Sequence, residues 1–303
     1  MEERYESWDL EEGDEIVPGR FAVELLGGGR RYEAYLAWDD AMHALVVAKL
    51  VRPNLVEDGR SLAGLAREAQ ALEALAHPSL VRGFGSVLGG ERPHVVLEYL
   101  DGPRLSTLLR RYGVILEQLL PLALELCSAL HYMAGRGFVH LDVKPKNIVM
   151  SAPPKLIDLS VAQSIEGLAA LESQVGTDPY MAPEQADTTR FAELGPPADV
   201  WGLGVTLYEA IAGALPFSAP GADSEPPPGR FPQILSAPAP LPRDVPPAVA
   251  ELVLACLEKS PADRPVAGEL AERIEPLVAG LPRPRLGLFR PGGRTQQTQF
   301  LPG

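Results

Sequence analysis

The residues best suited to chemistry lie in one segment, residues 140–160, which begins His-Leu-Asp-Val-Lys-Pro-Lys-Asn and ends Asp-Leu-Ser. Within it, Asp142, Lys144, Asn147 and Asp158 place two carboxylates, an ammonium group and an amide close together in the sequence. A carboxylate can accept the proton of an attacking hydroxyl, and a cation can neutralise charge on a migrating phosphoryl group. An amide and a second carboxylate suit magnesium ions that bridge phosphates. The segment therefore indicates phosphoryl transfer from a metal-bound nucleotide.

Length, charge and composition limit the class of protein. With 303 residues, 46% of them hydrophobic, the chain can form one large domain or two lobes. Its net charge of −13 argues against a nucleic-acid binder. The first fifteen residues hold eight acids and one arginine, unlike a secretory signal, and no apolar run reaches the roughly 18 residues of a membrane span. We expect a cytoplasmic protein in which Cys127 and Cys256 are inert buried thiols.

The hydrophobic pattern changes from strands to helices along the chain. Short apolar segments with tight turns predict an antiparallel meander, and apolar residues at helical spacing predict helices. The expected strands are 21–26, 32–38, 44–51, 80–88 and 94–98, with a helix at 59–76 among them. The helices expected later are 105–112, 116–135, 200–213, 248–258 and 266–279, with irregular stretches at 163–198 and 214–247. This order predicts a small β-rich lobe, a hinge and a larger helical lobe.

Further motifs surround the central segment. Three glycines, residues 27–29, lie between two expected strands, where backbone N–H groups can approach phosphates closely. Lys49 ends the run Val-Val-Ala-Lys, and Gly-Thr-Asp-Pro-Tyr-Met-Ala-Pro-Glu occupies 176–184. In this order, the motifs resemble those of the eukaryotic-type (Hanks-type) serine/threonine protein kinases found in bacteria.

The resemblance implies a fold and a division of the chain. The implied fold is the α+β, two-lobed protein kinase fold over residues 19–280. A small antiparallel β-rich N-lobe would occupy 19–100, and a larger helical C-lobe 101–280. Residues 1–18 are acidic and aperiodic, so we expect a flexible leader or a loosely docked arm. Residues 281–303 carry several arginines and no acid, and we expect a flexible tail.

The resemblance also implies a nucleotide site. Lys49 has apolar neighbours and needs a partner if buried; Glu68 is the implied partner, and a surface pair of Arg67 with Glu68 is the alternative. Kinases usually have Val at the place of Ala34 and Ala at that of Val47, an exchange that keeps the volume around adenine about constant. The implied nucleotide-binding residues are Leu26, Gly27, Gly28, Gly29, Ala34, Val47, Lys49, Glu68, Glu98, Leu100 and Val149, with the backbone of Glu98 and Leu100 at the adenine edge.

The implied catalytic residues come from the central segment and the later motif. Asp142 resembles the base that orients the attacking hydroxyl, and Lys144 resembles the cation at the γ-phosphate. Thr177 would bond both, which is a serine/threonine-type feature. Asn147 and Asp158 would bind Mg²⁺, or alternatively Mn²⁺. Structural roles are implied for His140, for Asp199, and for an ion pair between Glu184 and Arg264.

Four further positions depart from the family pattern. Tyr32 replaces the third glycine of the phosphate loop, which predicts a bulkier loop. Leu141 stands where most kinases have the arginine that pairs with a phosphate on the activation segment. This segment ends with the motif at 176–184 and offers Ser160, Ser164, Ser173 and Thr177 as hydroxyl residues, and we expect activity that does not depend on its phosphorylation. Leu159 and Ser160 replace the usual Phe and Gly, which predicts restricted flipping of this segment.

Three functions compete. The first is an ATP-dependent protein kinase that phosphorylates Ser or Thr of protein substrates. The second is a pseudokinase that binds nucleotide and serves as a regulatory scaffold. The third is a small-molecule phosphotransferase, which would lack the Ala-Pro-Glu motif. The tail adds a partner hypothesis, because Thr295 and Thr298 follow arginines and could be autophosphorylated and bound by a phosphothreonine-binding domain.

Overall fold

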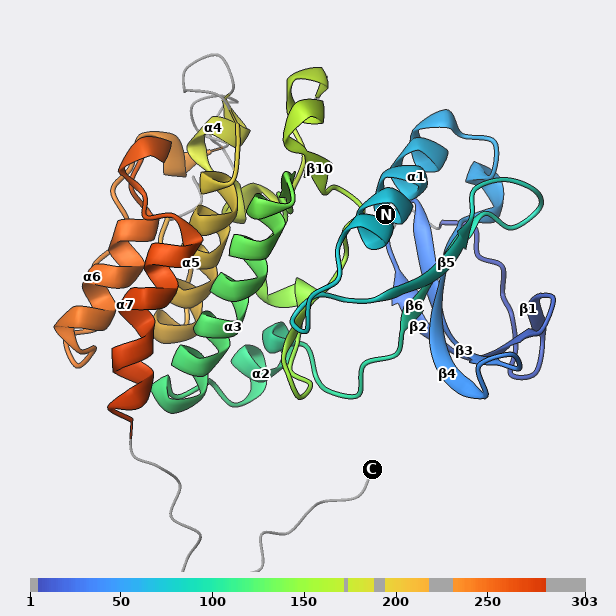
Figure 1. The fold of residues 1–303 in the computed structure, drawn as a ribbon, viewed down its shortest axis with the longest axis horizontal. Helices are drawn as coiled ribbons and strands as arrows, with labels where there is room; N and C mark the ends of the chain where they lie inside the picture. Colours follow the sequence, from blue (N-terminus) through green and yellow to red (C-terminus); the bar gives the residue numbers. More distant parts are fainter. Residues whose placement is uncertain (1–4, 172–173, 188–193, 218–230, 282–303) are drawn as a thin grey trace, which may run out of the picture.

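The chain forms two lobes in the structure, a computed structural model that describes residues 5–171, 174–187, 194–217 and 231–281 (Figure 1). A six-stranded sheet and one α-helix make up most of the described part of the first lobe, and helices make up most of the second. The predicted α+β, two-lobed architecture is confirmed.

The sheet of the N-lobe is antiparallel throughout, in the order β1-β2-β3-β4-β6-β5. Its strands are β1 (Glu15–Val17), β2 (Arg20–Gly28), β3 (Tyr32–Asp39), β4 (Ala44–Val51), β5 (Gly83–Val87) and β6 (His94–Glu98). Between β3 and β4, Ala34 lies opposite Lys49, and Leu36 lies opposite Val47. Because opposed residues share a face and side chains alternate along a strand, these four share one face of the sheet. This face packs toward α1, the only α-helix among the described residues of the lobe.

Helix α1 (Gly59–Ala74) has clear local causes. Asp58 caps it, because its Oδ2 accepts the N–H of Ser61 at 2.8 Å. Leu65 and Ala69, one turn apart, are buried against β4 and β6. The helix ends two residues earlier than the sequence pattern predicts.

The part of the acidic leader that the structure describes is docked on the N-lobe, which is the second of the two alternatives expected for it. Residues 15–17 form β1, which extends the sheet beside β2. Trp8 donates its backbone N–H to Glu33 at 2.8 Å and its indole N–H to the carbonyl of Val51 at 2.9 Å. Arg92 lies over the Trp8 ring at 4.9 Å. Residues 5–17 therefore belong to the N-lobe and cover the sheet face opposite α1.

Replacing Trp8 tests this docking. We expect Trp8→Ala to lower the free energy of unfolding by about 2–3 kcal/mol, because it removes a half-buried ring and an indole hydrogen bond. Trp38→Ala is the matched control, because Trp38 is 37% exposed and its indole N–H donates to its near neighbour Asp40 at 3.1 Å. Urea unfolding of both variants gives the comparison. Equal small losses for both would mean that residues 5–17 contribute no stability.

The C-lobe is built around the long helix α3, which packs against α5 and α7 (Figure 1). Its α-helices are α2 (Leu105–Arg111), α3 (Leu116–Gly135), α4 (Pro183–Ala186), α5 (Pro197–Ala212), α6 (Pro247–Cys256) and α7 (Ala267–Ala279). Its short strands are β7 (Phe138–Val139), β8 (Ile148–Val149), β9 (Lys155–Leu156) and β10 (Gln163–Ser164). The 3₁₀ helices of the two lobes are η1 (Pro53–Leu55), η2 (Pro145–Asn147), η3 (Ile165–Ala170), η4 (Asp178–Tyr180), η5 (Pro232–Ile234) and η6 (Pro261–Asp263).

Two expectations about the chain as a whole can be compared with the structure. Cys127 and Cys256 are unpaired and buried in the C-lobe core, and burial raises the pKa of both thiols. None of the helices described is long and apolar enough to span a bilayer.

Candidate active site

Asp199, in the first turn of α5, fixes the backbone of the expected catalytic loop, residues 140–147. Its two carboxylate oxygens accept the backbone N–H groups of His140 and Leu141, each at 2.7 Å. His140 continues the support: its Nδ1 accepts the N–H of Asp142 at 3.2 Å, which leaves Nε2–H to donate to the carbonyl of Ile157 at 3.2 Å. Burial raises the pKa of Asp199, and the two N–H donors offset part of this effect by stabilising its anion. His140 is thus structural, as the sequence predicts.

Asp142 is the centre of a hydrogen-bonded network that brings four of the expected site residues together. Its Oδ2 accepts from Lys144 Nζ at 2.6 Å and from Asn147 Nδ2 at 2.9 Å. Its Oδ1 accepts from the hydroxyl of Thr177 at 2.7 Å. Lys144 Nζ also donates to Thr177 Oγ1 at 2.5 Å, so an ammonium and a hydroxyl sit side by side on one carboxylate. Three side chains thus direct hydrogen bonds at this one carboxylate.

Lys49 of β4 forms the second charged cluster. Its Nζ lies 2.8 Å from a carboxylate oxygen of Glu68 on α1 and 2.9 Å from Oδ1 of Asp158. The expected Lys49–Glu68 contact is therefore present, rather than a surface pair of Glu68 with Arg67. Burial alone would lower the pKa of Lys49, but the two carboxylates outweigh it and raise the pKa. Lys49 correspondingly lowers the pKa of Asp158 against the effect of burial.

Asn147 and Asp158 lie at one end of the hairpin of β8 and β9. The pairing of Ile148 with Leu156 and the bond from the N–H of Ile157 to the carbonyl of Asn147 at 2.8 Å bring the two residues together. Because Asn147 Nδ2 is engaged by Asp142, its Oδ1 remains available as an acceptor. The side chain of Asp158 is 38% exposed. An amide oxygen beside a carboxylate fits a hard divalent cation that keeps water and phosphate ligands.

The expected adenine side of the site lies on the sheet face described above. Ala34 and Val47 are diagonal neighbours there, and Leu97 of β6 lies opposite Val47. Of the expected phosphate-loop residues, Leu26 to Gly28 form the end of β2, and Gly29 begins the turn to β3. A bond from the N–H of Gly29 to the carbonyl of Tyr32 closes this turn at 2.9 Å. The remaining expected residue of the C-lobe, Val149, is buried in β8, where it pairs with Arg104.

The hinge carries a contact between lobes that the sequence did not predict. Glu98, at the end of β6, accepts from Lys155 Nζ of β9 at 2.6 Å and from the N–H of Arg82 at 2.7 Å. Leu100 follows two residues later and is half-buried. The side chain of Glu98 thus anchors the hinge and leaves the expected nucleotide contacts to its backbone.

The departures from the family pattern have visible structural consequences. Leu141 is 3% exposed and packs in the C-lobe core, so it presents no cation to the activation segment. Ser160 donates its hydroxyl to Asp158 Oδ1 at 2.7 Å, on the oxygen that also accepts from Lys49. Leu159 is fully buried. Leu159 therefore fills the buried position that Phe usually occupies, and Ser160 adds a restraint on the Asp158 side chain.

Gln185 is a site-supporting residue that sequence reasoning missed. Its Nε2 donates to the carbonyl of Leu141 at 2.7 Å and to that of Val175 at 2.8 Å, which joins the end of the activation segment to the catalytic loop. A Cβ at Gly176, where φ is +115°, would lie 2.7 Å from the carbonyl oxygen of Leu141, so the close approach requires glycine. Because both acceptors of Gln185 are backbone carbonyls, side-chain types in the sequence give no signal for this contact.

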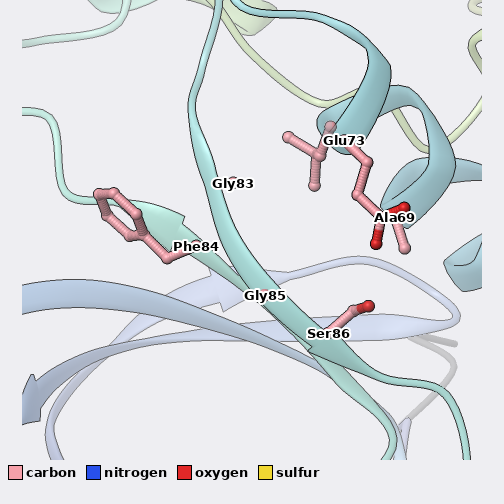
Figure 2. Close-up of a pocket in the computed structure, with 7 residues that line it drawn as sticks. Ala69, Glu73, Gly83, Phe84, Gly85 and Ser86 are labelled. Carbon is pink, nitrogen blue, oxygen red and sulfur yellow. The ribbon is translucent and has the colours of Figure 1, made fainter. Parts of the chain in front are cut away.

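A small pocket outside this site lies between α1 and β5. Figure 2 shows Ala69 and Glu73 of α1 facing the strand segment Gly83–Ser86. Its volume of about 210 Å³ is below the roughly 300 Å³ at which ligand pockets usually begin. We therefore assign it no ligand.

Comparison with known proteins adds two findings. The protein kinase domain family model matches residues 22–273. The serine/threonine-protein kinase PknA of Mycobacterium tuberculosis is 31% identical over 290 residues, which cover 92% of this chain and 66% of the relative. PknB of Mycobacterium leprae is 34% identical over 204 residues, which cover 64% of this chain and 32% of that protein. PknB of Mycolicibacterium smegmatis is 32% identical over 255 residues, which cover 80% of this chain and 40% of that protein. The chain thus spans about a third to two thirds of the length of these relatives.

Proposed function

The chain belongs to the protein kinase domain family, and we propose that it transfers the γ-phosphoryl group of ATP to Ser and Thr residues of protein substrates. The observation that carries this proposal is the network in which Lys144 and Thr177 both contact the carboxylate of Asp142. That network provides a proton acceptor beside a cation, which in-line phosphoryl transfer requires. The serine/threonine-protein kinases among its relatives support the same activity.

In the proposed mechanism, residues of this chain position the two reacting groups. Asp142 accepts a hydrogen bond from the substrate hydroxyl and takes its proton as the oxygen attacks the γ-phosphorus. Lys144 neutralises charge on the migrating group, and Lys49 holds the α- and β-phosphates. The bond from the γ-phosphorus to the bridging oxygen breaks, and ADP leaves with that oxygen.

A divalent cation completes the proposed site. We propose that Asn147 and Asp158 hold Mg²⁺, with Mn²⁺ as a substitute, because they supply an amide oxygen and a carboxylate at one end of the β8–β9 hairpin. The metal would neutralise phosphate charge when bound. Ser160 orients the Asp158 carboxylate toward this role through its hydroxyl.

The alternative scaffold function is less well supported. A pseudokinase that only binds nucleotide has no need for a buried carboxylate bonded to lysine, asparagine and threonine together. Asp142 is 8% exposed, and three side chains donate to it. A site arranged in this way favours catalysis. A small-molecule phosphotransferase is disfavoured by the buried ion pair of Glu184, in the Ala-Pro-Glu motif, with Arg264.

Transfer of labelled phosphate tests the proposal. Purified protein is incubated with labelled Mg-ATP, alone and with a generic basic protein, beside the Asp142→Asn variant. Label that appears on protein Ser or Thr in the wild type and is lost in the variant supports a kinase. Intact nucleotide binding with no label in either protein would favour the scaffold function.

Substrates, partners and location extend the proposal. We propose protein substrates, a cytoplasmic location, and a phosphothreonine-binding domain that binds the tail after autophosphorylation. Thr295 and Thr298, which carry the last proposal, lie outside the described residues, as does the expected tail beyond Leu281. Intact-mass measurement after incubation with ATP checks the tail, and a chain without phosphate on residues 283–303 would contradict it.

Glu68→Gln is expected to separate stability from activity. Burial raises the pKa of Glu68 despite the opposing charge of Lys49, so the folded state disfavours the ionised carboxyl. At pH values between the ordinary pKa of 4.5 and this raised pKa, the folded state binds more protons at Glu68 than the unfolded state does. Within that pH range, the free energy of unfolding of the wild type therefore rises as the pH falls. Since Asp158 still pairs with Lys49, we expect the variant to be at least as stable as wild type at pH 7–8, with transfer slowed about 10- to 100-fold. Denaturant unfolding at several pH values and a transfer assay measure both; a variant much less stable at pH 8 would contradict the prediction.

Activity is expected to be independent of activation-segment phosphorylation. Leu141 is buried and uncharged, and it stands where an arginine would bind a phosphate on the activation segment. A phosphate on that segment would therefore find no cation at this position to pair with. Phosphatase-treated protein should keep at least half of its transfer rate. A larger loss that rephosphorylation of Ser173 restores would contradict the prediction. Ser173 lies outside the described residues.

A further inference from the structure

Tyr32, the first residue of β3, connects the phosphate-loop hairpin to α1. Its hydroxyl donates to the carbonyl of Ser61, in the first turn of α1, at 2.7 Å. Ser61 is itself held by Asp58, whose Oδ2 accepts its N–H at 2.8 Å and its hydroxyl at 2.7 Å. Through Ser61, Tyr32 restrains the N-terminal turn of the helix that carries Glu68.

The ring of Tyr32 also contacts the lysine that Glu68 holds. Lys49 Nζ lies 5.1 Å from the ring centroid, within the range of a cation–π interaction. The sheet register explains this contact, because Tyr32 lies opposite Val51 and so shares a face with Lys49, two residues before it. Tyr32 therefore touches both the lysine and the helix that supplies its carboxylate partner.

Gly64 on α1 provides the space for this tyrosine. A Cβ on Gly64 would lie 2.4 Å from the hydroxyl oxygen of Tyr32 but 3.7 Å from its Cζ. Glycine is a poor residue for a helix interior, so local preference does not account for it in the second turn of α1. The close approach of the Tyr32 hydroxyl does account for it.

We propose that Tyr32 is a positioning residue for phosphoryl transfer, which holds α1 and Lys49 in the arrangement where Glu68 pairs with Lys49. The inference rests on the proposed function, because the pair matters when Lys49 holds phosphates. Lys49 has a second carboxylate within reach, that of Asp158. If α1 moved away with Glu68, Lys49 would be left with Asp158, which the metal also needs. Tyr32 disfavours that state by tying the helix and the lysine to the same strand.

A double-mutant cycle between Tyr32 and Gly64 tests the proposal. Tyr32→Phe keeps the ring and removes the hydroxyl; we expect kcat to fall about five- to tenfold, with hydrogen exchange of the α1 amides near Glu68 faster by a similar factor. Gly64→Ala displaces the hydroxyl and should produce the same losses in the wild-type background. In the Tyr32→Phe background, Gly64→Ala should change either quantity less than twofold, because the added methyl group then meets Tyr32 Cζ at 3.7 Å and Arg67 Nη2 at 3.8 Å, which are ordinary contact distances.

Two matched controls separate this effect from general damage. Gly59→Ala makes the same change in the same helix at a place where a Cβ meets nothing within 4 Å, and Tyr112→Phe removes the hydroxyl of a tyrosine that is 79% exposed. Both should leave kcat and exchange unchanged. Additive effects of the two test substitutions, or slower α1 exchange in Gly64→Ala with unchanged kcat, would overturn the proposal. If wild type transfers no phosphate, the proposed function fails, but the exchange cycle still decides the role of Tyr32.

Discussion

Asp142→Asn is expected to slow phosphate transfer about 10³-fold or more while the protein stays folded and still binds Mg-ADP. The variant loses the group that accepts the hydroxyl proton, and general-base catalysis of this kind contributes about 10²–10⁴-fold. Lys49, Asn147 and Asp158, which are proposed to hold the nucleotide and metal, remain in place. The loss should therefore appear in kcat rather than in nucleotide affinity.

The hydrogen-bond network explains why asparagine fits at this position. Its carbonyl oxygen can take the place of Oδ2, which accepts from Lys144 and Asn147. Its NH₂ group then takes the place of Oδ1, next to Thr177, whose hydroxyl oxygen can accept a bond. We therefore expect the free energy of unfolding to fall by no more than about 1 kcal/mol.

Asp244→Asn serves as the matched control, because Asp244 is exposed in the segment before α6. Single-turnover transfer, Mg-ADP titration and urea unfolding are measured for both variants and for wild type. Transfer by Asp142→Asn above about a tenth of the wild-type rate would show that another group accepts the proton.

The elements and much of the candidate site could be predicted because their signals are local. Apolar spacing places α1 and α3 to within two residues at each end. Asp142, Lys144 and Asn147 lie within six residues of one another, so their proximity follows from the short loop that carries them. The start of α5 was predicted three residues late, although a proline at the first helical position, Pro197, is a known start signal.

The contacts that could not be predicted join residues far apart in the sequence. Glu33 reads as an exposed strand residue, yet it is 1% exposed and bonds Ser7, Trp8 and Arg52, which lie 19 to 26 residues away. Composition made the leader look flexible because acidic, aperiodic segments bury little surface alone. Glu33 on β3 supplies a buried acceptor for Ser7 and Trp8, so the leader gains contacts that its own composition does not indicate. The packing of Tyr32 against α1 is a second contact of this kind.

Arg264 forms a buried ion pair with Glu184, the glutamate of the Ala-Pro-Glu motif. Its two terminal nitrogens donate to the two carboxylate oxygens at 2.6 and 2.8 Å, and both side chains are fully buried. The same guanidinium donates to the carbonyls of Pro197 at 2.9 Å and Glu258 at 2.8 Å. It therefore joins the end of the activation segment to the start of α5 and the segment after α6.

Arg264→Met is expected to lower the free energy of unfolding by about 3–5 kcal/mol, because it leaves the Glu184 carboxylate buried without a partner. This is a large part of the roughly 5–15 kcal/mol that stabilises a typical protein. Adding Glu184→Gln should recover at least about 1 kcal/mol, because it removes the buried charge although the carbonyls stay unpaired. Arg264→Lys should lie between wild type and Arg264→Met, since lysine keeps the charge but not the bidentate geometry. Urea unfolding of the four proteins measures the series, and a double variant less stable than Arg264→Met would mean that the pair is not what stabilises this junction.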